Sequence, residues 1–127
     1  MFRKYIMNQY NFGKDQETIV YQKLLEKFPN LKQTKGKWDS WDFYDDNVFI
    51  ELKSRKCSSN QFNSTLIGSN KITNGEYENN NNKLIYYFFN FKDKLMFWKY
   101  QPNIKFNQRL LYGKWNSEIP FDILNDF

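Results

Sequence analysis

The residues best suited to chemistry lie in one short stretch that contains Asp42, Glu51 and Lys53. Asp46 and Asn47 both tolerate the backbone of a tight turn, so a two-residue turn there would join two strands into a hairpin. In that register Asp42 faces Glu51, with Cβ atoms roughly 5 Å apart. Like charges in direct opposition destabilise a sheet, and a divalent cation between them would turn the repulsion into a binding site.

The cation expected from these ligands is magnesium, with manganese as a substitute. The chain contains no histidine and one cysteine, Cys57, so the available ligands are hard oxygens. The same composition excludes Ser–His and Cys–His catalysis and a structural zinc site. Lys53 lies two residues after Glu51, on the same face of the strand. Its ammonium group could lower the pKa of an attacking water or stabilise charge on a phosphate.

The hairpin register also predicts two distinct faces. The apolar face is predicted to contain Trp41, Phe43, Ile50 and Leu52. The polar face is predicted to contain Ser40, Asp42, Glu51 and Lys53. The alternative is that the polar face is only solvated, with Lys53 offsetting the two acids, because a Glu-x-Lys triplet is common on strands.

Glu17 adds a third carboxylate. Residues 14–28 are expected to form a helix that stops before Pro29. At about 100° per residue, Glu17 falls in the apolar stripe with Val20 and Leu24. A carboxylate there is expected to point inward or toward a cleft, where it needs a partner. The alternative is a first-turn glutamate favoured by the helix dipole.

The rest of the sequence predicts the elements that would position these residues. The strand expected at 84–91 is apolar on both faces, which is typical of a central strand. The order of elements predicts an α+β (mixed α/β) fold, with helices flanking a central mixed sheet in one domain over residues 1–127. The other expected elements are strands at 31–35, 40–45, 48–55, 95–100 and 109–115, a helix at 70–78, and a polar irregular segment at 58–69.

This arrangement resembles the PD-(D/E)XK nuclease superfamily. The matching residues are Glu17 on the helix, then Asp42 and Glu51-Leu52-Lys53 on two strands. The element order over residues 14–91 is similar to the family's restriction-endonuclease-like αβββαβ core. The small size and the glutamate on the leading helix are similar to archaeal Holliday junction resolvases, and the overall pattern also resembles small resolvase-like nucleases of large DNA viruses. One departure is Trp41, which stands where the family motif has proline; Asp39 is a second available acid.

The resemblance implies a magnesium-dependent endonuclease that hydrolyses phosphodiester bonds in DNA, with a branched substrate favoured. Asp42 and Glu51 would ligate the metal together with the Leu52 carbonyl, and Lys53 would orient or activate the water. Glu17 would support this metal or a second one, or orient Lys53. Lys71 resembles the extra polar residue that some members carry on the second helix. A resolvase makes paired cuts, which would imply a homodimer. The resemblance also implies a role in DNA repair or recombination, including that of a viral protein in its host cell.

The charge of the chain fits a polyanionic partner. The formal net charge is +5 and the sequence pI is about 9.2. The expected nucleic-acid contacts are Lys35, Lys37, Arg55, Lys56, Lys71 and Trp38, with packing of Trp38 into the fold as the alternative. No apolar run long enough for a membrane span and no secretory signal are found, which predicts a cytoplasmic or nuclear protein.

Two other functions fit the same residues. One is a non-catalytic nucleic-acid-binding module with the same fold, although the intact acid and lysine set argues against it. The other is an RNA endonuclease of similar chemistry, which ranks lower because cap-snatching members commonly carry a histidine.

Overall fold

The computed structural model describes residues 2–35 and 40–127, with side chains from Asn11 onward. Three residues singled out from the sequence, Lys37, Trp38 and Asp39, lie outside this described part. None of the helices in the described ranges is long and apolar enough to cross a membrane.

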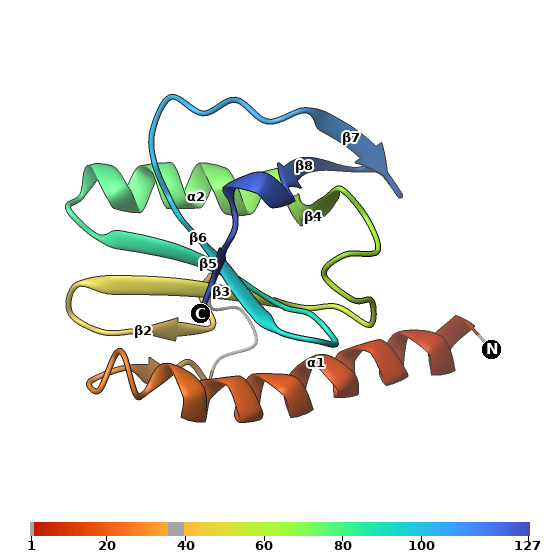
Figure 1. Cartoon of the computed structure of the whole chain (residues 1–127), viewed down its shortest axis with the longest axis horizontal. Helices are drawn as coiled ribbons and strands as arrows, with labels where there is room; N and C mark the ends of the chain where they lie inside the picture. The colour runs from red at the N-terminus through yellow and green to blue at the C-terminus, as the bar shows by residue number, and fades with distance from the viewer. Residues whose placement is uncertain (1, 36–39) are drawn as a thin grey trace.

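Two helices cover opposite faces of a mixed sheet (Figure 1). Helix α1 (Phe2–Leu24) lies on one face and α2 (Ser69–Asn80) on the other. This confirms the predicted α+β class with its mixed sheet between helices. The strands of this sheet, in spatial order, are β1 (Lys32–Gln33), β2 (Phe43–Tyr44), β3 (Val48–Ser54), β5 (Leu84–Asn90), β6 (Leu95–Lys99) and β9 (Asn125–Asp126).

Strand β5 is the centre of the fold, as its apolar sequence predicted. It pairs in parallel with β3 and antiparallel with β6, and five of its seven residues are buried. A parallel pair needs a crossover connection, and α2 lies in the connection between β3 and β5. One face of the sheet packs on α1 through Val20 and Leu24, while the other packs Ile85 and Tyr87 beneath α2.

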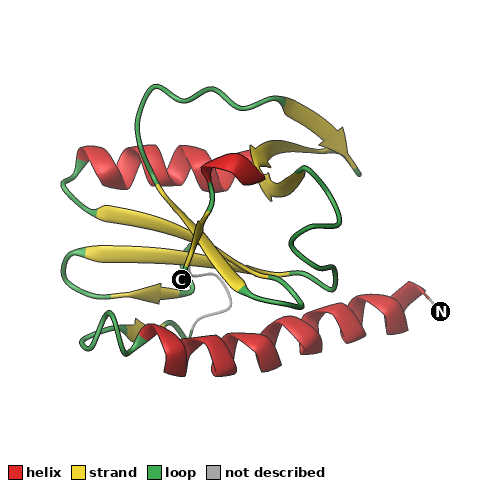
Figure 2. Ribbon diagram, in the orientation of Figure 1, coloured by secondary structure: helices red, strands yellow, loops and turns green. Residues whose placement is uncertain are grey.

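A second, smaller sheet lies beside the N-terminal end of α2 (Figure 2). It contains β4 (Ser64–Gly68), β8 (Lys114–Pro120) and β7 (Gln108–Leu111), all antiparallel. A 3-10 turn, η1 (Phe121–Ile123), then leads toward β9.

Two predictions fail at this sheet. Residues 58–69 are not irregular throughout, because 64–68 pair with β8. The single strand expected at 109–115 is a hairpin, since Tyr112 and Gly113 adopt positive φ angles of 51° and 76° and reverse the chain. Strand β4 buries alternate residues, Thr65 and Ile67, but the polar residues that precede it show no strand pattern in the sequence.

The predicted hairpin register between β2 and β3 is confirmed where the strands pair. Phe43 lies opposite Ile50, and Tyr44 lies opposite Phe49. At the turn, the Asp45 carboxylate accepts hydrogen bonds from the backbone N–H groups of Asn47 and Val48, at 2.7 and 2.8 Å. This side chain therefore fixes the turn that sets the register.

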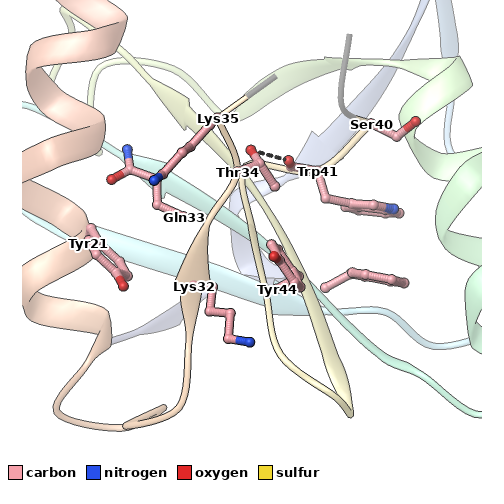
Figure 3. Close-up of a pocket in the computed structure, with 9 residues that line it drawn as sticks. Tyr21, Lys32, Gln33, Thr34, Lys35, Ser40, Trp41 and Tyr44 are labelled. Carbon is pink, nitrogen blue, oxygen red and sulfur yellow. Dashed lines mark hydrogen bonds between the residues drawn. The ribbon is translucent and has the colours of Figure 1, made fainter. Parts of the chain in front are cut away.

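The predicted placement of Trp41 on the apolar face with Phe43 is wrong. Strand β2 begins only at Phe43, and the Asp42 N–H donates to the Ile50 carbonyl (3.0 Å), so regular alternation stops there. Trp41 instead stacks on Phe49, with ring centroids 5.5 Å apart, in the cluster beneath α2. Figure 3 shows Trp41 across the strands from Tyr21, held by the hydrogen bond that Thr34 Oγ1 donates to its carbonyl (2.8 Å).

Gly75 allows α2 to lie close against β5. A Cβ atom at this position would lie 1.9 Å from the Tyr87 hydroxyl oxygen. That hydroxyl donates a hydrogen bond to the Lys71 carbonyl at 2.7 Å, one turn earlier on the helix. The glycine that weakens the helix signal in the sequence is therefore the residue that lets α2 dock.

We expect Gly75→Ala to lower the free energy of unfolding by about 1–3 kcal/mol, because the added methyl group overpacks the contact with Tyr87. Urea denaturation followed by circular dichroism measures the change. Gly13→Ala in α1 is the matched control, since its Cβ would meet no atom within 4 Å. That control should leave stability unchanged or raise it by up to about 1 kcal/mol. Equal stability of the two variants would contradict the close-packing role of Gly75.

Candidate active site

Glu51 is the centre of the polar cluster on β3. Its side chain is 4% exposed, although it carries a carboxylate. Two ammonium groups approach the same oxygen, Oε1: Lys53 Nζ at 3.4 Å and Lys71 Nζ at 3.6 Å. Lys53 comes from the same strand, while Lys71 comes from the first turn of α2. The docking of α2 therefore brings the second cation to Glu51.

Burial dominates the electrostatics of Glu51. Loss of solvation, reinforced by the negative charge of Asp42, raises the pKa of Glu51 from 4.5 to about 7. The positive charges of Lys53 and Lys71 act in the opposite direction. The pKa of Glu51 stays raised, so the two lysines do not fully offset the effects of burial and of the Asp42 charge.

Asp42 occupies the place where β2 stops pairing with β3. Its Oδ2 accepts a hydrogen bond from the Leu52 N–H at 2.7 Å, so the side chain replaces a missing strand partner. In an extended strand the N–H and C=O of one residue point to the same side. The Leu52 carbonyl therefore also faces the Asp42 side of β3.

The predicted cross-strand pairing of Asp42 with Glu51 lies beyond the regular ladder. The last paired residue of β2 is Phe43, and the Asp42 backbone is shifted toward Ile50. The two carboxylates nevertheless interact, since Asp42 raises the pKa of Glu51. The structure thus brings Asp42, Lys53 and Lys71 around Glu51, the middle residue of β3.

Glu17 points inward, as the helical wheel predicted, but it contacts a different strand. It is 7% exposed, and its Oε1 accepts a hydrogen bond from Gln33 Nε2 at 3.1 Å. Lys14 Nζ lies 3.8 Å from its Oε2. None of the ion pairs of Glu17 in the described ranges involves Lys53. Glu17 therefore links α1 to β1 and does not join the cluster around Glu51.

Those predicted nucleic-acid contacts that the structure describes do not form one patch. Lys35 lines a hollow at the β1–β2 edge of the sheet (Figure 3). Lys56 Nζ lies 5.0 Å from the ring centroid of Phe12 on α1. Arg55 is largely enclosed, and its guanidinium donates to Thr65 Oγ1 (3.3 Å) and to the Leu66 carbonyl. Burial lowers the pKa of Arg55, and these bonds to β4 give it a structural role. Of this set, Lys71 alone contacts Glu51 among the described residues.

A groove beside the cluster contains residues that the sequence analysis missed. Lys53 and Lys71 line it from β3 and α2, and Lys114, Trp115 and Asn116 line it from β8. The groove has a volume of about 790 Å³. The sequence signal was present, because Lys114 and Trp115 directly follow the Tyr112-Gly113 turn, but the hairpin and its position were not predicted.

The electrostatics of Glu51 give a testable dependence of stability on pH. A pKa raised above the unfolded value means that the folded state binds the proton more tightly. The contribution of Glu51 to stability is therefore present at low pH and lost as pH rises through about 7. In EDTA, wild-type protein should lose up to about 3 kcal/mol relative to Glu51→Gln between pH of about 5 and 8.

Urea denaturation of both proteins across this pH range measures that difference. Glu26→Gln, at an exposed glutamate after α1, is the control and should follow wild type. Parallel pH curves for wild type and Glu51→Gln would show that the burial of Glu51 does not raise its pKa.

The described residues contain no cluster of three or more aspartate, glutamate, cysteine or histidine side chains positioned to hold a metal ion. The acidic ligands available at this site are thus the two carboxylates of Asp42 and Glu51. Comparison of the chain with protein-family models, with curated proteins and with solved structures finds no match.

Proposed function

We propose that this protein is a magnesium-dependent endonuclease that hydrolyses phosphodiester bonds in DNA. The observation that carries the proposal is the buried Glu51 carboxylate, which lies between the negative charge of Asp42 and the ammonium groups of Lys53 and Lys71. A purely structural ion pair has no need of the second carboxylate, which raises the free energy of the charged state. A metal site requires it.

The oxygen atoms at this place suit magnesium or manganese. Two carboxylates and the Leu52 carbonyl side of β3 offer hard ligands, and no histidine or thiolate competes for the ion. A bound cation would remove the repulsion that raises the pKa of Glu51. Magnesium, when bound, supplies a Lewis acid for a phosphoryl oxygen and for the attacking water.

The lysines supply the remaining functions. The Lys53 side chain is about one-third exposed and lines the groove, so its ammonium group reaches both Glu51 and the solvent side. From there it can orient a water molecule or stabilise negative charge on the phosphate. Lys71 lies on the same carboxylate oxygen and fits a role in holding the charge of Glu51 and of the substrate.

The element order supports the PD-(D/E)XK assignment as part of this proposal. The order is α1, β1, β2, β3, β4, α2, β5, which is an αβββαβ core with one strand inserted before α2. Glu17 fits a supporting role in this scheme, because it holds Gln33 of β1 and thereby the chain that leads toward β2. We do not place it among the groups that touch substrate.

Cleavage assays test the proposal directly. Wild-type protein with magnesium or manganese should cut labelled DNA, and EDTA should abolish the product. Glu51→Ala and Lys53→Ala should each lower the rate at least about 100-fold, the scale expected for removing one electrostatic group from a catalytic centre. The substrates are four-way junction, duplex and single-stranded DNA, with RNA as the arm for an RNA endonuclease.

The exposed Glu26→Gln variant is the matched control and should cut like wild type. Symmetric paired cuts in the junction arm, with a dimer in solution, would support a resolvase. Equal cleavage by wild type, Glu51→Ala and Lys53→Ala would mean that the active site lies elsewhere.

Magnesium binding is also expected to stabilise the fold. A ligand that binds only the folded state raises stability by about 2.7 kcal/mol at a concentration 100 times its Kd. Thermal unfolding at neutral pH should therefore shift upward with added magnesium in wild type and shift much less in Glu51→Gln. The same shift in both proteins would place the bound cation away from Glu51.

A nucleic-acid-binding module without catalysis is the second candidate. The observation that favours it is the pair of lysines on Glu51, because two ammonium groups at 3.4 and 3.6 Å already give this carboxylate partners of opposite charge without a metal. A wild-type protein that binds DNA but neither cuts it nor responds to magnesium would establish this function in place of the nuclease.

A further inference from the structure

The β7–β8 hairpin presents an exposed aromatic side chain to the groove beside Glu51. Trp115 is 58% exposed and lines the groove that Lys53 and Lys71 also line. An indole ring in this position leaves an apolar aromatic face open to a partner that enters the groove. Across the hairpin Trp115 pairs with Leu110, which is itself 55% exposed, so this pairing leaves more than half of the indole uncovered.

The hairpin is held in a defined place relative to α2. Ser117 Oγ, which is buried, lies 3.0 Å from Ser69 Oγ at the start of the helix. Gln108 Nε2 on β7 donates to the same Ser117 oxygen at 3.0 Å. Because both strands of the hairpin are tied to the helix that carries Lys71, Trp115 has a fixed position beside the cluster around Glu51.

The charge of the groove identifies the kind of partner. Three lysines line it, Lys53, Lys71 and Lys114, and its described lining contains no carboxylate side chain. Ser69, Asn70 and Asn116 add neutral hydrogen-bonding groups. Lysines bind phosphates through charge, and an indole ring stacks on a nucleobase. The combination is complementary to a nucleic-acid strand and not to an apolar peptide or a basic protein.

The ring further restricts the form of the nucleic acid. Within a duplex, neighbouring base pairs cover both faces of each base, so an indole can stack only on a base that is unpaired or at an end. We propose that Trp115 forms a stacking subsite for one unpaired base of a DNA strand, whose phosphates lie along Lys53, Lys71 and Lys114. The inference that this subsite selects a substrate rests on the proposed nuclease function. The inference that it binds an unpaired base does not depend on that function.

The test measures binding in EDTA, so that cleavage does not contribute. The probes are a fluorescein-labelled oligothymidylate and a blunt duplex of the same length, read by fluorescence anisotropy. We expect Trp115→Ala to weaken oligothymidylate binding roughly tenfold, the loss expected for one stacked base. Duplex affinity should change less than about twofold, because all but the terminal bases are paired and covered on both faces, so its binding depends on lysine contacts to phosphate. Trp115→Phe should keep most of the affinity, since it retains a ring.

Two controls separate stacking from loss of fold or of exposed aromatic surface. Tyr77→Ala removes an aromatic ring that is 66% exposed on α2 and outside the groove lining, and should bind like wild type. Circular dichroism should show that Trp115→Ala is folded, as expected for an exposed side chain. Oligothymidylate should also quench tryptophan fluorescence in wild type, and less so in Trp115→Phe.

The outcomes distinguish this subsite from the nuclease itself. If Trp115→Ala binds oligothymidylate as tightly as wild type, or loses both probes equally, the stacking subsite is wrong, whatever the cleavage assay gives. If the selective loss occurs but wild-type protein cuts no DNA with magnesium, the subsite stands and the proposed enzyme falls. Selective loss together with cleavage that depends on Glu51 would support both.

Discussion

The burial of Glu51 is the constraint on which the arrangement of the site depends. A carboxylate that is nearly excluded from water must either be neutral or have positive charges close by. Here Lys53 and Lys71 provide those charges, while Asp42 acts against them and helps to keep the pKa near 7. A buried acid placed beside a second acid and two cations is costly for stability, and such electrostatic tension is common at functional sites.

The position of α2 decides whether Glu51 obtains its second positive charge. Lys71 reaches Glu51 only because the helix lies close to β5, and the contact between Gly75 and Tyr87 sets that closeness. The Tyr87 hydroxyl also binds the Lys71 carbonyl, so the same aromatic residue fixes the helix turn that carries the lysine. Core packing and the electrostatics of the candidate site are thus coupled through one tyrosine.

The smaller sheet gives the site its second wall. Arg55 continues from β3 and ties its guanidinium to Thr65 and Leu66 of β4, which joins the two sheets next to Lys53. Strand β8 pairs with β4 and carries Trp115 to the groove. Arg55, which the sequence predicted as a nucleic-acid contact, therefore holds β4 and, through it, the strand that carries Trp115.

The sequence by itself determined the local features: the mixed α+β class, the central apolar strand, the turn at Asp46-Asn47 with its register, and the inward-facing Glu17. These depend on periodicity and turn chemistry between residues close in the chain. Tertiary structure alone decided that Trp41 packs under α2, that Glu17 binds Gln33, and that the β7–β8 hairpin lies beside Lys53. Such contacts join residues far apart in the chain, and no local pattern records which of the available surfaces will meet.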